Sequence, residues 1–119
     1  MPVDIKYRFE AEYVVASMAG DPTIDEFVAA LQEIGGASVR WDQRCVIVDL
    51  TGVQRKYSFT EQLVIGQAAA LNFGHLRKAA AVVPPERITR VGEKAAHHSG
   101  ARQISVFASE QEAADWFRS

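Results

Sequence analysis

The segment between two predicted elements near the middle of the chain holds the side chains with the most evident chemical use. These are Asp49, Thr51, Arg55, Lys56 and Ser58. A hydroxyl at the start of a helix, beside free backbone N–H groups and two cations, can receive a phosphate, a carboxylate or an acidic protein surface. The same residues also fit a structural role, in which Ser58 only caps a helix and the two cations are solvated. Both interpretations stay open from the sequence.

Catalysis is not indicated by the residue pattern. Asp49 has the chemistry of a general acid or base, but no second carboxylate, histidine or lysine is placed beside it by the sequence. Its alternative role is that of a turn carboxylate that accepts from the backbone near Thr51. The serines lack a Gly-x-Ser-x-Gly context, and no glycine-rich phosphate loop follows a strand. We therefore expect no catalytic residues and a protein that is not an enzyme.

Metal and cofactor sites are not indicated either. His97 and His98 are adjacent, so on a helix they point about 100° apart and are poorly placed to bind one ion. Glu93 and His97 could share a helical face, but no third ligand accompanies them. Cys45 begins an apolar run and is expected in the core. The sequence predicts no metal site and no cofactor.

Composition indicates one globular domain over residues 1–119. Hydrophobic residues make up 48% of the chain and charged residues 24%. The longest strongly apolar run, residues 79–83, is far shorter than the roughly 18 residues of a membrane-spanning helix. The first residues contain no apolar signal-peptide core, and the single cysteine fits a reducing compartment. We expect a cytoplasmic protein without a membrane span.

The charges are unevenly placed along the chain. Residues 1–53 carry a net charge of −5, residues 54–102 carry +5, and the remainder carries −2. An overall charge of −2 argues against a nucleic-acid-binding protein, whose domain is usually basic. The charge split, together with the aromatic residues Tyr7 and Trp41, leads us to expect a homodimer.

The elements that position these residues follow from hydrophobic periodicity and capping signals. Strands are predicted at residues 3–9, 13–18, 45–48, 79–83 and 104–107, and helices at 23–34, 58–73, 85–98 and 109–117. Capping boxes begin three of the helices, at Thr23, Ser58 and Ser109, and Gly35 and Gly36 are expected to end the first helix. The order predicts an α/β fold: a five-stranded mixed sheet with an opening hairpin, parallel elsewhere, and four helices.

Two segments of the chain resemble the STAS domain of anti-sigma-factor antagonists, the SpoIIAA-like fold. The strand and turn at residues 46–53, Val-Ile-Val-Asp-Leu-Thr-Gly-Val, are similar to the family's buried strand and its Asp-Leu-Ser/Thr-Gly step. The ending at residues 106–117 is similar to the family's last strand and helix. The resemblance implies a non-enzymatic regulatory domain with a serine at the start of the second helix, where Ser58 stands.

One departure separates this chain from the family members that are phosphorylation switches. Its helix start reads Lys-Tyr-Ser-Phe-Thr (residues 56–60), without the acid that precedes and the glycine that follows the regulatory serine. In this respect it is similar to a divergent branch of the superfamily. We expect it to bind a protein partner or a small anion near the start of the second helix. The alternative is a small-molecule or lipid-binding module with a pocket between sheet and helices.

Overall fold

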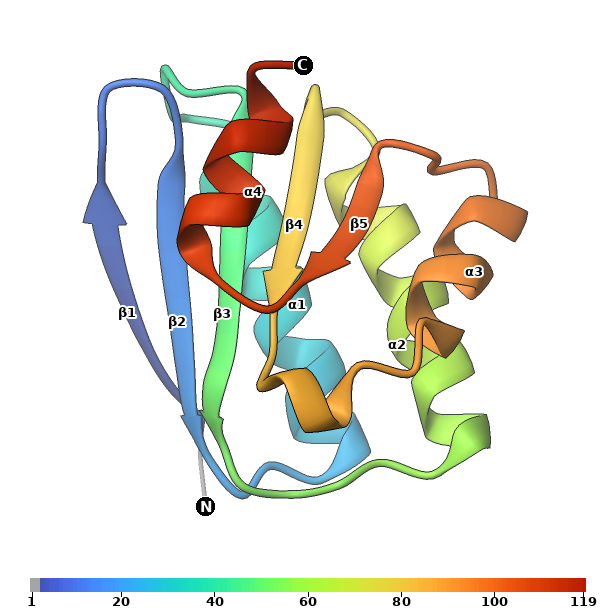
Figure 1. Cartoon of the computed structure of the whole chain (residues 1–119). Helices are drawn as coiled ribbons and strands as arrows, with labels where there is room; N and C mark the ends of the chain where they lie inside the picture. The colour runs from blue at the N-terminus through green and yellow to red at the C-terminus, as the bar shows by residue number, and fades with distance from the viewer. Residues whose placement is uncertain (1–2) are drawn as a thin grey trace.

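The sheet of this protein is mixed, and its strands lie side by side in the order in which they occur in the sequence (Figure 1). A computed structural model describes residues 3–119. Met1 and Pro2, the first residues of the segment without a signal-peptide core, lie outside the described residues. The elements are β1 (Asp4–Phe9), β2 (Val14–Gly20), α1 (Ile24–Ser38), β3 (Cys45–Val53), α2 (Phe59–Phe73), β4 (Lys78–Val82), the 3-10 turn η1 (Pro85–Arg87), α3 (Val91–His98), β5 (Ile104–Phe107) and α4 (Glu110–Phe117).

Strand pairing confirms the predicted fold class. β1 is antiparallel to β2, whereas β2, β3, β4 and β5 are mutually parallel. The carboxyl ends of β2 to β5 therefore lie along one edge of the sheet, where loops gather the polar residues. Within residues 3–119, no helix is long and apolar enough to cross a membrane.

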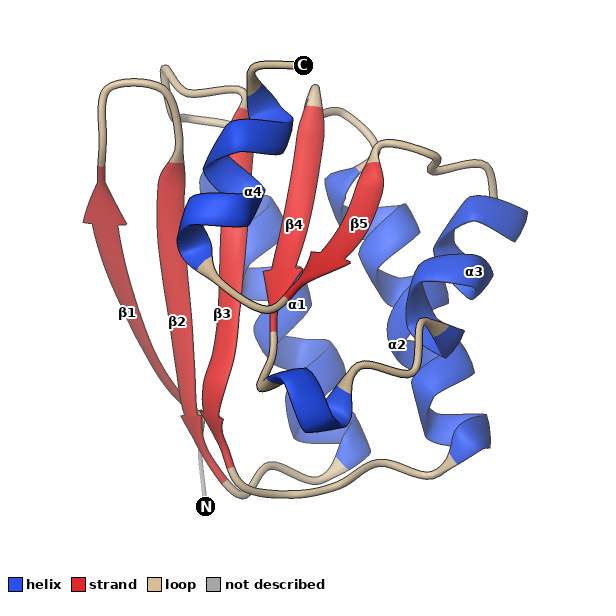
Figure 2. Cartoon of the chain, viewed as in Figure 1, coloured by secondary structure: helices blue, strands red, loops and turns tan. Residues whose placement is uncertain are grey.

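The middle strand, β3, is covered on both faces. Figure 2 shows α4 over one face of the sheet and α1, α2 and α3 on the other side. Val46 and Val48 belong to the larger core, which includes side chains of α1 and α2. Cys45 and Ile47 point to the opposite face and pack with Phe117 of α4. This alternation follows from the two-residue period of a strand, and it explains why the run is apolar at every position.

Two helices begin as their capping boxes predict. The Thr23 hydroxyl accepts from the Glu26 N–H at 3.2 Å, and the Glu26 carboxylate accepts from the Thr23 N–H at 2.8 Å. Ser58 begins α2 in the same way. At α4, the Ser109 hydroxyl accepts from the Glu112 N–H at 3.2 Å. Satisfying these otherwise unpaired donors fixes where each helix starts.

The prediction that Gly35 and Gly36 end the first helix is wrong. The helix continues to Ser38, whose buried hydroxyl donates to the Gly35 carbonyl at 2.7 Å. Gly35 is required for packing instead, because a Cβ there would lie 2.7 Å from the carbonyl oxygen of Asn72 on α2. Two helices approach closely at this point, and the glycine permits that approach.

The single helix predicted over residues 85–98 is also wrong, because the segment is interrupted. η1 ends at Arg87, and Arg90 has φ 61°, in the left-handed region, immediately before α3. The Glu93 carboxylate accepts from the Val106 N–H and the Ser105 hydroxyl, both at 2.8 Å, which attaches α3 to β5. The Arg87 guanidinium donates to the carbonyl of Val53 at the end of β3. These attachments outweigh the helical preference of the intervening residues.

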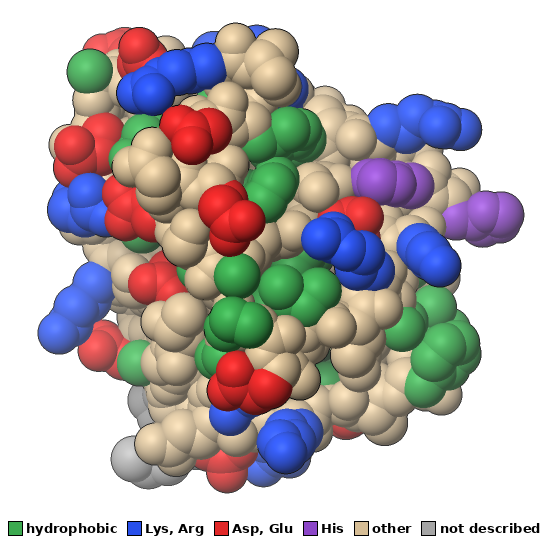
Figure 3. Space-filling view, in the orientation of Figure 1, with side chains coloured by type: hydrophobic (Ala, Val, Ile, Leu, Met, Phe, Trp, Pro, Cys, Tyr) green, Lys and Arg blue, Asp and Glu red, His purple; other side chains and the backbone are tan. Residues whose placement is uncertain are grey.

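The charge split along the sequence is partly a split in space. Figure 3 shows most of the acidic side chains of this face over β1, β2 and α4, whereas the side over α3 carries mostly Lys, Arg and His. The aromatic residues that suggested a homodimer pack within the chain: Tyr7 and Trp41 lie edge to face, with ring centroids 5.8 Å apart. Phe9 borders them and is 57% exposed. The homodimer stays a prediction.

The two neighbouring glycines of α1 give a matched test of this packing. Gly35→Ala is expected to lower the free energy of unfolding by about 1–3 kcal/mol, because its methyl group meets the Asn72 backbone. Gly36→Ala is expected to raise it by about 0.5–1 kcal/mol, because nothing lies near that position and alanine favours a helix. Urea denaturation of both variants measures the difference. Equal effects would contradict the assigned helix contact.

Candidate functional site

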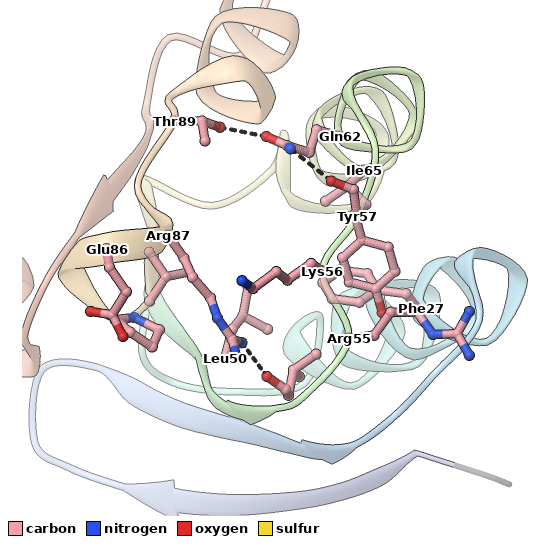
Figure 4. Close-up of a pocket in the computed structure, with 13 residues that line it drawn as sticks. Phe27, Leu50, Arg55, Lys56, Tyr57, Gln62, Ile65, Glu86, Arg87 and Thr89 are labelled. Carbon is pink, nitrogen blue, oxygen red and sulfur yellow. Dashed lines mark hydrogen bonds between the residues drawn. The ribbon is translucent and has the colours of Figure 1, made fainter.

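A cavity of about 450 Å³ opens at the carboxyl ends of β3 and β4 (Figure 4). It lies where α1, α2, the loop before α2 and η1 meet the sheet. Its lining residues are Phe27, Leu50, Val53, Arg55, Lys56, Tyr57, Gln62, Ile65, Val83, Pro84, Glu86, Arg87 and Thr89. This is the edge of a parallel sheet at which α/β proteins generally bind ligands.

The inner walls of the cavity are apolar. Phe27 and Val53 are buried, while Leu50 and Ile65 are half-buried and pack against the larger core. A second, smaller cavity of about 50 Å³ shares Phe27, Leu50 and Ile65 with the first and lies against Val48 and other core residues. The apolar surface therefore extends from the cavity toward the interior between the sheet and α2.

Two cations face the cavity. Figure 4 shows the Lys56 side chain reaching across it toward the side that holds Arg87. Within residues 3–119, Lys56 has neither an ion-pair partner nor a hydrogen-bond acceptor. Arg87 is anchored by its hydrogen bond to the Val53 carbonyl. Glu86 also lines the cavity, but in Figure 4 its carboxylate points away from the space enclosed by the other residues.

The third lining cation, Arg55, is directed elsewhere. Its Nε donates to the Asp21 carboxylate at 3.0 Å, and Figure 4 shows the guanidinium pointing away from the cavity. This hydrogen bond raises the pKa of Arg55 above its usual value. Both partners are substantially exposed, so solvent screening keeps the contribution of this pair to stability small.

Hydrogen bonds hold the rim of the cavity in place. Thr89 donates to the Gln62 side chain, and Gln62 Nε2 donates to the Tyr57 carbonyl at 2.9 Å. The Tyr57 hydroxyl donates to the Pro22 carbonyl at 2.7 Å, and its ring packs edge to face on Phe27 at 5.2 Å. Burial raises the pKa of Tyr57 to about 12. The loop before α2 is thereby tied to α1, α2 and the segment after η1.

The structure accounts for the five predicted site residues in different ways. Arg55 and Lys56 line the cavity. Ser58 is the N-cap: its hydroxyl accepts from the Glu61 N–H at 3.1 Å, and its own N–H donates to the Glu61 carboxylate at 2.9 Å. Thr51 donates to Asp49 through its hydroxyl at 2.7 Å and its backbone N–H at 3.0 Å, and neither residue is among those that line the cavity.

The sequence interpretation missed the residues that complete the cavity. Arg87, Gln62 and Thr89 were not among the predicted site residues; they come from η1, α2 and the segment between η1 and α3. The available signal for Arg87 was its position after the two prolines that follow β4, at the same sheet edge as Lys56. Gln62 and Thr89 carried no signal of their own, because polar residues at exposed helix and loop positions are common.

Two of the three histidines, His75 and His97, are engaged in other contacts. His75 Nε2 lies 2.8 Å from the Ser38 hydroxyl, and His97 Nε2 lies 2.6 Å from the Ile104 carbonyl. Across residues 3–119, no group of three or more His, Cys, Asp or Glu side chains is arranged to hold a metal ion. Cys45 is buried and accepts a hydrogen bond from Arg77 at 3.2 Å.

The outer face of α2 is unusually poor in charge. The helix spans 15 residues and contains one charged side chain, Glu61. Its exposed apolar residues are Phe59 (64% exposed), Val64 (39%) and Leu71 (82%). Val64 and Leu71 are seven residues apart and therefore lie on the same side of the helix. Solvated helix faces normally carry charges, so this surface has the composition of a protein contact.

Comparison with known proteins identifies the fold. No model of a known protein family matches the sequence, and no curated protein matches it. The crystal structure of an anti-sigma factor antagonist from Mycobacterium paratuberculosis superposes with a TM-score of 0.68 at 17% sequence identity, covering 98% of this chain and 95% of that one. This chain has the fold of an anti-sigma factor antagonist. The resemblance to the STAS fold is thus confirmed in three dimensions over nearly the whole chain. In this STAS-like fold, the cavity and the exposed face of α2 lie on either side of one helix.

The N-cap of α2 is testable by a single substitution. Ser58→Ala is expected to lower the free energy of unfolding by about 1 kcal/mol, because the Glu61 N–H loses its acceptor. Thr60→Ala is the matched control, since Thr60 is an exposed hydroxyl residue in the same turn and does not cap. Urea denaturation measures both. An unchanged midpoint for Ser58→Ala would place the helix start elsewhere.

The half-buried phenol of Tyr57 predicts a pH dependence of stability at alkaline pH. Its pKa in the folded protein, about 12, exceeds the usual 10.0, so its contribution to stability is complete below pH 10 and is lost as pH rises through about 12. Tyr57→Phe is expected to cost about 1 kcal/mol near neutral pH, because the hydrogen bond to Pro22 is lost. Urea denaturation measures the free energy of unfolding of the unsubstituted protein and of Tyr57→Phe. The difference between these two free energies should become smaller as the pH rises from about 10 to about 12. A constant difference would contradict the assignment.

Proposed function

We propose that this protein is a non-enzymatic regulatory domain that binds a protein partner through α2 and the loop that leads into it. The observation that supports the proposal most is the exposed, nearly uncharged face of α2 that presents Val64 and Leu71. Depletion of charge and enrichment of large apolar side chains distinguish the central part of protein interfaces from ordinary surface.

The fold supports the same class of role. The neighbouring structure is of an anti-sigma factor antagonist, a protein that by its name acts on another protein. We infer that this chain likewise docks a regulatory protein, and that the partner presents an apolar surface to α2. Phe59, at the first turn, is also exposed and lies next to the polar loop before the helix.

The predicted site residues form the polar end of the proposed surface. Arg55, Lys56 and Ser58 precede the first turn of α2, and Asp49 and Thr51 are held to each other at the end of β3. Exposed charges at the rim of an interface steer association and set its salt dependence more than they set affinity. We therefore assign these residues to orientation of the partner and the α2 face to affinity.

The test begins with site-specific photo-crosslinking in cells. A photoreactive amino acid at Leu71 is expected to capture a protein that the same group at exposed Glu12, in the turn between β1 and β2, does not capture. The captured protein is then purified and its direct binding is measured by titration calorimetry. Failure to capture any protein specifically from Leu71 contradicts the proposal.

Substitution then places the contact on α2. Leu71→Glu is expected to weaken binding of the purified partner at least about tenfold, because a carboxylate would be buried at an apolar contact. Ala11→Glu adds the same charge at an exposed position far from α2 and is expected to leave binding unchanged. Leu71 is 82% exposed, so its replacement is not expected to disturb the fold. Equal binding by the Leu71→Glu variant would overturn the proposed surface.

A further inference from the structure

We propose that the cavity beside α2 binds a small monoanionic organic molecule, with its acid group at Lys56 and Arg87 and its apolar body between Leu50 and Ile65. This inference goes beyond the protein-interaction role and does not rest on it, because it concerns the inner face of α2 rather than the outer one. The ligand class is an apolar acid, either a medium-length acyl carboxylate or an aromatic acid.

The size and lining of the cavity support an apolar body. Its volume of about 450 Å³ lies within the range of small-molecule sites, which are commonly about 300–1,000 Å³. The inner walls are formed by Phe27, Leu50, Val53 and Ile65, and the smaller cavity of about 50 Å³ continues the apolar surface inward. An apolar group that binds there would be transferred out of water and would contact apolar side chains of the core, which is favourable.

The charges at the cavity support an acid group on that body. The Lys56 ammonium extends over apolar walls and has no ion-pair or hydrogen-bond partner among residues 3–119. The Arg87 guanidinium uses one N–H on the Val53 carbonyl, and a guanidinium has five. A carboxylate between these two groups would accept charge-assisted hydrogen bonds from both cations.

The surroundings limit the charge of the ligand. The carboxylate of Glu61 is fixed at the start of α2 by the N–H of Ser58, so negative charge already occupies the helix start beside the loop. Arg55 is neutralised by Asp21. Two cations with a nearby carboxylate match one negative charge better than the several charges of a nucleotide, and no lining carboxylate is directed inward to receive a cationic ligand.

The cavity is also held open in advance of binding. The hydrogen bonds from Thr89 to Gln62 and from Gln62 to the Tyr57 carbonyl join the segment after η1 to the loop before α2. The Tyr57 ring and the Arg87 anchor fix the two remaining sides. A site that needs little rearrangement keeps more of its contact energy as affinity.

Titration calorimetry of the full chain tests the inference with defined probes. Decanoate represents the acyl acids, naphthoate the aromatic acids, and decanol the same acyl body without charge. At least one of the acids is expected to bind with one-to-one stoichiometry and more tightly than decanol. Tighter binding of decanoate would identify an acyl carboxylate as the ligand class, and tighter binding of naphthoate would identify an aromatic acid. Absence of binding by both acids, or equal binding of decanoate and decanol, would overturn the proposal.

Variants assign the binding to this cavity. Lys56→Gln is expected to weaken the acid about tenfold, because a charge-assisted contact is lost. Arg102→Gln removes an exposed cation that does not line the cavity and should leave binding unchanged. Ile65→Trp is expected to abolish binding by filling the space, with thermal unfolding as the check on the fold. If that variant does not fold, Val83→Phe fills the cavity from another lining position. Unchanged acid binding by Lys56→Gln or by a folded cavity-filling variant would overturn the proposal.

Discussion

The burial of β3 on both faces is the constraint on which the rest of the structure depends. Because residues 45–48 lie between two layers of helices, every side chain in that run must be apolar. Polar side chains are tolerated in β3 only from Asp49 onward, where the strand leaves the core. The candidate site residues therefore gather at one edge of the sheet, and the loop that follows is free to carry cations. The same edge receives Arg87 after β4, which is parallel to β3 and ends beside it.

Much of this architecture could be predicted from the sequence because it depends on local physics. Strand alternation, the apolar run at β3 and the capping hydroxyls at Thr23 and Ser58 each act within a few residues, and the structure confirms them. Gly35 shows where local reasoning fails. A glycine near the end of a helical pattern indicates a terminus by propensity, but here it permits α2 to approach through Asn72, a contact between segments far apart in sequence.

The candidate site was predictable to a similar extent. Arg55 and Lys56 were expected at this edge because they follow a buried strand, and both line the cavity. The alternative of a pocket between sheet and helices could not be assigned to particular residues, since the cavity forms only when η1, α2 and the loop before α2 come together. Arg87 reaches the cavity because the segment 85–98 is interrupted rather than one continuous helix. Hydrogen bonds from this segment to β3 and β5 hold it in that interrupted form. Such contacts leave no periodic signal in the sequence.

The two proposed roles use opposite sides of α2 and share the loop that precedes it. The central claim is that the outer side of this helix is the protein contact. Hydrogen–deuterium exchange of the chain with and without its purified partner tests that claim most directly. Our account predicts slower exchange in residues 54–71 and unchanged exchange in α4, on the opposite face of the sheet. Protection centred on α4 or on β1, with α2 unchanged, would contradict it.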